Sequence, residues 1–311
     1  MVYHEAMVPR LLAVCLLAST LSFAGITDAV RTRLERNDFA AAEAALQGYR
    51  TAQGVTPDYL EALSWMARAS LVANRFDRAE TYARQTESLS RQLLLKRALD
   101  QEPHLPVALG AALEVQAQLL AARGQQAQAV ALLRRSLIAY RNTSIQPRLR
   151  KNLNLLGLAG QPAPPLKVAQ YLGPKPVALS QLTGSPVLLF FWAHWCGDCK
   201  AEGPVIAQLR SEFGPRGLIL LAPTQLYGYA AQGEDAQPKD ELPYIERVWQ
   251  HFYPGLQNVP VPVSKENFDL YGASTTPTLV LLDRTGRVAL YHPGVIPYAE
   301  LRAAIQKTIA R

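Results

Sequence analysis

Seven consecutive apolar residues, Val187–Ala193, lead within three positions to a Cys-x-x-Cys at Cys196 and Cys199. A run this short and this apolar, bounded by Pro186, predicts a strand that is buried on both faces of a sheet. The spacing of apolar residues from Cys196 to Gly214 then predicts a helix. The sequence therefore predicts a strand–helix junction with two cysteines at it.

This junction suits redox chemistry. The first turn of a helix leaves backbone N–H groups without partners and presents the positive end of the helix dipole, and both favour a thiolate at Cys196. In such motifs the thiol pKa falls from ~8.5 into roughly the 3.5–7.5 range. Cys199 lies one turn further on, where it can attack a mixed disulfide on Cys196. A purely structural disulfide is a weak alternative, because so short a loop barely constrains the unfolded chain.

The rest of the C-terminal half alternates strands with helices. Gly217–Pro223 is expected to form a second buried strand, Asp240–Tyr253 a helix, Thr276–Gly294 a hairpin, and the last residues an amphipathic helix. Strands with helices between them predict a mixed sheet covered on both faces. The polar, tyrosine-containing segment at 224–240 is expected to be a loop near the cysteines. It could shape substrate choice or be a tolerated insertion, and the second interpretation is preferred.

The N-terminal half, residues 28–158, has helical periodicity throughout. Three stretches resemble one another, "RNDFAAAEAAL" from Arg36, "ANRFDRAETYA" from Ala73 and "ARGQQAQAVALL" from Ala122. Their spacing of 37 and then about 50 residues suggests a degenerate tetratricopeptide-like repeat, whose stacked helices would bind a protein partner. A helical bundle for dimerisation or spacing is the alternative. Residues 159–176 are expected to be a linker, and the start of the next domain, near Val177–Pro186, an edge strand and turn.

The N-terminus has the layout of a secretory signal peptide, assigned to residues 1–24. Arg10 precedes an apolar run of 14 residues, Leu11–Ala24, that ends in small residues. The third cysteine, Cys15, falls within this run. The mature chain is therefore expected in the periplasm or outside the cell, or at the membrane if the segment is not cleaved. The 159–311 domain would then work in an oxidising compartment.

Two motifs about 80 residues apart resemble the TlpA-like thiol–disulfide oxidoreductases of the thioredoxin superfamily. The first is "FWAHWCGDCKAEGP", where the matching residues are Phe191, Trp192, Ala193, Trp195, Cys196, Cys199, Lys200, Glu202 and Pro204. The second is "YGASTTPTLVLLDRTGRV", from Tyr271 to Val288. The resemblance covers roughly Pro162–Arg311 and leaves the helical half unexplained.

The resemblance implies a thioredoxin-like fold and exchange of disulfides with client proteins through Cys196 and Cys199. It implies a cis peptide at Thr276–Pro277 facing the cysteines, with the Thr276 backbone docking extended client chain. Trp195 would contact the client, and Trp192 would pack in the core. Thioredoxins carry a buried aspartate where this chain has Phe190, so the resemblance suggests Glu202 as the local acid–base group. The alternative for Glu202 is an ordinary surface position.

Three residues beside the cysteines are expected to tune them. The dipeptide between the cysteines is Gly197–Asp198, and the aspartate should disfavour a thiolate on Cys196. A disfavoured thiolate makes the dithiol the better reductant, so net reduction of client disulfides is predicted. His194 would act in the opposite sense if protonated, with its side chain facing solvent.

Other functions explain the cysteine pair less well. A peroxiredoxin-type peroxidase would need a threonine before the first cysteine, and "WAHWCGDC" has none. Two thiolates form an incomplete zinc site, although a Cu(I) site with His194 or a redox-sensing clasp on an interaction protein remains an alternative. No metal and no organic cofactor is expected. The net charge of +7 has no dense basic run, so the expected partners are client proteins and a redox partner, with no nucleic acid.

Overall fold

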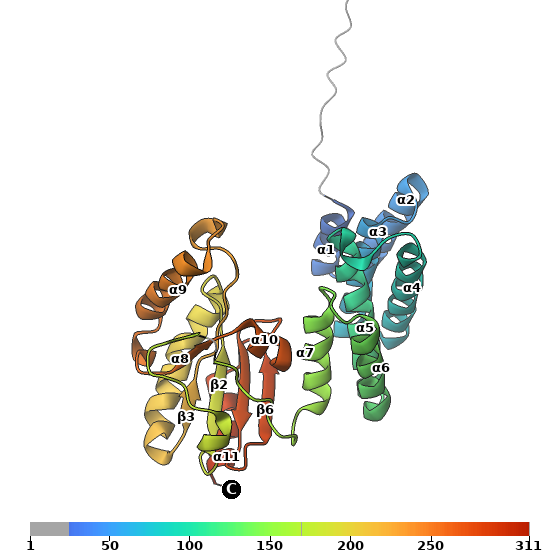
Figure 1. Cartoon of the computed structure of the whole chain (residues 1–311). Helices are drawn as coiled ribbons and strands as arrows, with labels where there is room; N and C mark the ends of the chain where they lie inside the picture. The colour runs from blue at the N-terminus through green and yellow to red at the C-terminus, as the bar shows by residue number, and fades with distance from the viewer. Residues whose placement is uncertain (1–24, 169, 311) are drawn as a thin grey trace, which may run out of the picture.

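The computed structural model describes residues 25–168 and 170–310. The predicted signal peptide and Cys15 lie outside these residues. The chain forms a helical half followed by a mixed sheet with helices on both faces, and helix α7 lies between the two (Figure 1). The predicted order, a helical domain followed by an α/β domain with a mixed sheet, is confirmed.

The helical half is a series of antiparallel helices. They are α1 (Ile26–Glu35), α2 (Phe39–Gln53), α3 (Pro57–Val72), α4 (Phe76–Leu94), α5 (His104–Ala122), α6 (Gln126–Ala139) and α7 (Gln146–Gly157). α3 packs on both α4 and α5, and α5 packs in turn on α6 and α7. α5 is long and apolar enough to cross a membrane, but most of it is buried inside this helical core. It is therefore the central helix around which the others stack.

Three joints between helices coincide with the three similar stretches of sequence. A residue in the left-handed conformation, Asn37, Asn74 or Gly124, stands two positions before the next helix. Asparagine and glycine adopt this conformation most readily. The stretches therefore are repeated helix–turn–helix units, and the 50-residue spacing is explained by the length of α4 and a short 3₁₀ turn at Leu99–Gln101. A tetratricopeptide identity stays a prediction.

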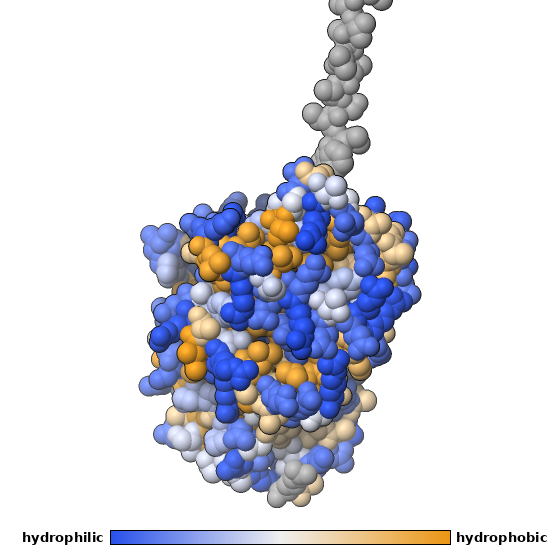
Figure 2. All heavy atoms as spheres, turned by 90° about the vertical axis from the view of Figure 1, so that its right-hand side faces the viewer, coloured by the Kyte–Doolittle hydropathy of each residue, from blue (hydrophilic) through white to orange (hydrophobic). Residues whose placement is uncertain are grey.

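The outward face of the helical half carries mostly hydrophilic side chains with apolar ones scattered among them (Figure 2). Leu95, Val72 and Ile138 are the most exposed large apolar residues of the helical half among the described residues.

The C-terminal half is built on a four-stranded sheet of order β3-β2-β5-β6. β2 (Val187–Phe191) is parallel to β3 (Ile219–Leu221) and antiparallel to β5 (Thr278–Leu282), which pairs with β6 (Val288–Pro293). β1 (Gln170–Leu172) and β4 (Val261–Val263) pair antiparallel, and β4 runs beside the chain that follows β3. The Asp283–Gly286 turn confirms the predicted hairpin.

Helices cover both faces of this sheet. Leu188 and Phe190 face a core formed with α8 (Gly197–Phe213), α9 (Pro238–Phe252) and α11 (Tyr298–Ile309). Leu189 and Phe191 point the other way, toward α10 (Lys265–Tyr271) and the segment after α7. Every residue of β2 is therefore buried, as the sequence predicted.

Two expectations about the joint between the halves were wrong in detail. Part of the expected linker, Gln170–Leu172, is strand β1, since its backbone pairs with β4. The expected edge strand near Val177–Pro186 contains a 3₁₀ turn at Leu179–Leu182 instead. The apolar side chains Leu179 and Leu182 pack down onto the sheet, which a short turn allows.

The two halves meet where α7 crosses the end of α10. The Asn154 side chain donates a hydrogen bond of 2.8 Å to the Tyr271 carbonyl oxygen, and Asn154 is buried. Gly272, in the left-handed conformation, lies directly against the backbone of Arg150 and Lys151. A Cβ at Gly272 would lie 2.6 Å from the Arg150 carbonyl carbon and 2.8 Å from the Lys151 Cα. Only glycine permits so close an approach.

We expect Gly272→Ala to weaken this joint. Gly286 also has a positive φ but faces open space, so Gly286→Ala is the matched control for backbone strain alone. Overpacking should make Gly272→Ala about 1–3 kcal/mol more destabilising than the control, measured as the free energy of unfolding in denaturant. Equal losses would show that the contact relaxes without cost.

Candidate redox-active site

Cys196 lies in the short segment between β2 and α8, directly before the first turn of the helix. Its Sγ accepts a hydrogen bond of 3.0 Å from the Cys199 backbone N–H and caps the helix. The strand and the helix thus hold the sulfur where free N–H groups and the helix dipole stabilise negative charge. This is the environment predicted from the sequence.

The two cysteines differ in access. They are joined by a disulfide, with their Cα atoms 5.3 Å apart. Cys196 is 4% exposed and Cys199 is fully buried. Of the two, only Cys196 offers any surface to an incoming sulfur, so it is the one placed to meet another molecule.

A second segment reaches the cysteines from far along the chain. The Thr276–Pro277 peptide is cis, as the resemblance implied. The Thr276 carbonyl oxygen lies 3.4 Å from Cys196 Sγ. β5 starts at Thr278, whose register partner on β2 is Phe191. Because β2 and β5 are neighbours in the sheet, Thr276 and Pro277 are brought to the same edge as Cys196.

Glu202 lies one turn beyond Cys199 on α8 and is 5% exposed. The alternative of an ordinary surface position is therefore wrong. Burial raises its pKa, although a hydrogen bond from the Ile296 backbone and the charge of His292 oppose this. Within the described residues its Oε1 is buried without a hydrogen-bond partner. A carboxyl group that holds its proton more tightly than usual thus lies on the same helix as Cys199.

His194 does not face solvent, which corrects the expectation from sequence. The side chain is 1% exposed, and its Nε2 lies 3.5 Å from Oε1 of the equally buried Glu241. The rings of Tyr227, Tyr229 and Tyr244 meet it edge-on at 5.3–5.4 Å. The pKa of His194 is lowered, chiefly by burial, although the neighbouring Glu241 carboxylate opposes this. The neutral imidazole is favoured, so the tuning by a protonated, exposed histidine is not supported.

Glu241 is a site residue that the sequence analysis missed. Its carboxylate accepts backbone hydrogen bonds from Tyr227 at 2.5 Å and from Gly228 at 2.9 Å. It thereby ties the 224–240 loop to α9 and to His194. Tyr227 also packs against Trp195 with ring centroids 5.6 Å apart. The loop therefore adjoins the cysteines as predicted, and it is an ordered part of their surroundings.

The remaining predicted residues lie around the pair as follows. Trp195 is 50% exposed, and Gly197 and Asp198 are exposed in the first turn of α8. Solvent around Asp198 weakens its effect on Cys196. Trp192 is fully buried and donates from Nε1 to the Ala222 carbonyl oxygen at 3.1 Å, as expected of a core residue.

No group of three or more His, Cys, Asp or Glu side chains that could hold a metal occurs in the part of the chain that the structure describes.

The buried Glu202 predicts a pH dependence of stability. A carboxyl with a raised folded-state pKa adds stability that is complete below its ordinary pKa of 4.5 and is lost as the pH rises through the folded-state pKa. Wild type should therefore lose unfolding free energy between pH 4 and pH 8, and Glu202→Gln should lose less of it over the same range. The exposed Glu246→Gln should show no such change. Parallel pH profiles for wild type and Glu202→Gln would contradict the expectation.

Removal of the Glu241 carboxylate should loosen the loop. Glu241→Ala leaves the backbone N–H groups of Tyr227 and Gly228 without their acceptor and removes the carboxylate 3.5 Å from the buried His194. We expect a loss of about 3 kcal/mol in unfolding free energy and faster amide exchange at Tyr227 and Gly228. Glu246→Ala, at an exposed position of the same helix, is the control. Unchanged exchange at both amides would refute the role of Glu241.

Comparison with known proteins agrees with this geometry. A family model described as a thioredoxin-like domain matches residues 176–309. The thiol:disulfide interchange protein DsbE of Xylella fastidiosa is 29% identical over 140 residues, which are 45% of this chain and 63% of that protein. The thiol-disulfide oxidoreductase ResA of Oceanobacillus iheyensis is 36% identical over 75 residues, which are 23% of this chain and 39% of that protein. The chain thus spans less than two thirds of the length of these relatives.

Among solved structures, a candidate DsbE protein from Chlorobium tepidum is 29% identical, with a TM-score of 0.38. The match covers 49% of this chain and 97% of that one. The C-terminal half of this chain is a thioredoxin-like domain, similar in sequence to the thiol–disulfide oxidoreductases DsbE and ResA.

Proposed function

We propose that the protein is an exported thiol–disulfide oxidoreductase that reduces disulfides of client proteins. The observation that carries this proposal is the placement of Cys196, a residue that is 4% exposed, at the N-terminus of α8 with its Sγ 3.4 Å from the Thr276 carbonyl oxygen. The names of the relatives support the reaction class. Export is supported by the signal-like sequence of residues 1–24.

The reaction starts from the dithiol form. The Cys196 thiolate attacks one sulfur of a client disulfide, the client S–S bond breaks, and the departing client thiolate takes up a proton. Cys199 then loses its proton and attacks the Cys196 sulfur. This second exchange releases the client as a dithiol and leaves the Cys196–Cys199 disulfide. Two electrons have moved to the client, and a dithiol on a redox partner must return them.

The surrounding residues have separate tasks in this scheme. The Thr276 backbone beside Pro277 binds extended client chain next to Cys196, and the half-exposed Trp195 ring contacts the client. Glu202, in its carboxylate form, accepts the proton of Cys199, because both groups are buried one helical turn apart. Asp198 and Gly197 leave the thiolate less stabilised than a cationic neighbour would, which favours the reducing direction.

Trapping of the mixed disulfide tests the exchange. Cys199→Ser should accumulate a covalent adduct with a disulfide-containing client, because no second thiol can resolve it. Cys196→Ser should give no adduct, because Cys199 is fully buried. Both are scored by mass shift under non-reducing conditions. An adduct through Cys199 alone would reverse the assigned roles.

The direction of electron flow is tested by the redox equilibrium of the pair. Alkylation in a graded thiol buffer should give a potential near the ~−270 mV of thioredoxin. A value nearer the ~−120 mV of a strong oxidant would make the protein a disulfide donor and contradict the proposed role of Asp198.

A further inference from the structure

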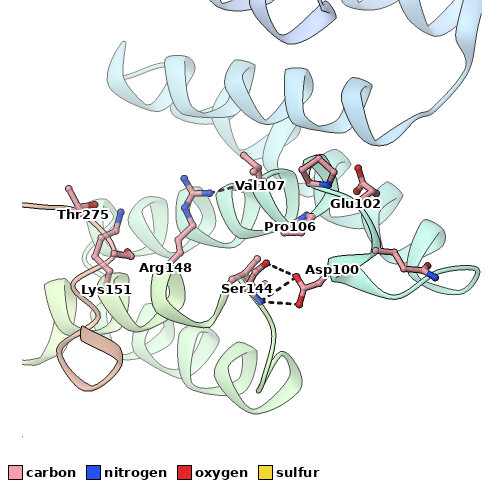
Figure 3. A pocket seen from close by; sticks show the side chains of 12 residues that line it. Asp100, Glu102, Pro106, Val107, Ser144, Arg148, Lys151 and Thr275 are labelled. Atoms are coloured by element: carbon pink, nitrogen blue, oxygen red, sulfur yellow. Dashed lines mark hydrogen bonds between the residues drawn. The ribbon is translucent and has the colours of Figure 1, made fainter. Parts of the chain in front are cut away.

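A cavity of about 750 Å³ lies where the helical half meets the loop before Thr276. This volume is within the roughly 300–1,000 Å³ usual for ligand sites. Its walls come from three places: the chain around the start of α5, the start of α7, and Ser274 with Thr275. Figure 3 shows Thr275 and Lys151 at one end and Asp100 and Glu102 toward the other. The cavity thus lies between the helical half and the loop that leads to Thr276 in the redox-active site.

The position of Thr275 links this cavity to the chemistry. Thr276, the next residue, has its carbonyl oxygen 3.4 Å from Cys196 Sγ. An extended chain advances only about 3.3–3.6 Å per residue. A client polypeptide whose cysteine reacts at Cys196 therefore has neighbouring residues close enough to enter the cavity.

The acidic groups of the cavity are already engaged. The Asp100 carboxylate accepts hydrogen bonds from the Ser144 backbone N–H at 3.1 Å and from the Ser144 hydroxyl at 2.5 Å. The Glu102 carboxylate accepts from the backbone N–H groups of His104 at 3.0 Å and Leu105 at 2.6 Å, at the start of α5. These contacts fix the far wall and supply hydrogen bonds to both carboxylates, which keep their negative charges because the donors are neutral.

The basic groups are only partly compensated. Arg148 and Lys151 both pair with Glu114, at 2.9 Å and 3.4 Å. Within this group of three, two cations share one carboxylate and leave one positive charge in excess, while the negative charges of Asp100 and Glu102 lie toward the other end of the cavity. The Lys151 side chain is 15% exposed and that of Arg148 27%, so water screens this charge less than at an open surface. The excess lies at the end of the cavity next to Thr275 (Figure 3).

The other walls suit an extended polypeptide. Pro103, Pro106, Val107 and Ile145 also line the cavity. Proline has no N–H group that a bound chain would have to satisfy, and the apolar side chains can contact the client's own. The cavity combines apolar walls with a cationic end near the reactive sulfur.

We propose that this cavity binds the client segment that flanks the reacting cysteine and selects segments with a carboxylate side chain a few residues from that cysteine. Lys151 and Arg148 attract the carboxylate, and Pro106 and Val107 contact the residues beyond it. The helical half is then a specificity domain for the oxidoreductase. This inference rests on the proposed reduction of client disulfides.

The test uses the full mature chain, reduced beforehand and mixed with an excess of a fluorescent peptide that holds one intramolecular disulfide. Three peptides differ only in the residue three positions from the reacting cysteine, which is Glu, Gln or Lys. One set of peptides carries this residue before the cysteine and a second set carries it after the cysteine. Single-turnover rates avoid the need for a redox partner. Wild type should reduce the Glu peptide about tenfold faster than the Lys peptide, and added salt should shrink the difference.

Variants locate the preference. Lys151→Glu should abolish or reverse it, while Arg135→Glu, the same charge change at an exposed position of α6, should leave it intact. Val107→Trp fills the cavity without changing charge and should slow all three peptides. None of these variants should change the rate with dithiodipyridine, a small uncharged disulfide that needs only Cys196.

The outcomes separate this inference from the proposed function. If wild type reduces neither the peptides nor dithiodipyridine, the proposed function fails. If it reduces all three peptides equally, or if Lys151→Glu keeps the preference while dithiodipyridine reduction is normal, the inference alone is overturned. Self-association of wild type that Lys151→Glu breaks up would also overturn it, because a second copy would then occupy the cavity.

Discussion

The junction between β2 and α8 is the constraint on which the site depends. β2 is buried on both faces at the centre of the sheet, so the residue at its end has a fixed position. A short segment, residues 192–196, leads from β2 to α8, whose N-terminal N–H groups face Cys196 Sγ. Loosening of β2 would move the sulfur away from the positive end of the helix dipole. The Cys196 thiolate would then lose the stabilisation that this dipole provides.

The sheet also determines what stands opposite the sulfur. β5 runs antiparallel to β2, and its first residue, Thr278, is in register with Phe191. The chain that precedes β5 therefore arrives at the cysteine edge, where Thr276 approaches Cys196. Two motifs separated by about 80 residues become one site because the strands that carry them are neighbours.

A second constraint is the contact at Gly272, which holds the helical half in place. Backbone lies against backbone there, and Asn154 hydrogen-bonds the Tyr271 carbonyl oxygen. Since Gly272 is only a few residues before Thr276, the same contact that joins the halves brings Lys151 and Arg148 beside the active-site loop. The packing of the halves and the proposed selection of clients thus have one structural origin.

Buried ionisable groups around the pair show where sequence reasoning is weakest. Spacing along α8 placed Glu202 near Cys199, but only the packing of the helix showed that its carboxyl is buried and its pKa raised. The sequence alone led us to expect that His194 faces solvent. The covering residues, Tyr227, Tyr229, Tyr244 and Glu241, come from a distant loop and helix. Only the folded chain brings these residues to His194.

By itself the sequence determined the local elements: the buried strand at Val187, the helix after Cys196, the helix–turn–helix units at Asn37, Asn74 and Gly124, and the hairpin at Asp283–Gly286. These follow from periodicity and turn chemistry, which act over a few residues. The tertiary structure alone decided that residues 170–172 join β4, that Glu241 faces His194, and that α7 rests on Gly272. Such contacts depend on which surfaces meet after the chain folds, and no spacing within one segment encodes them.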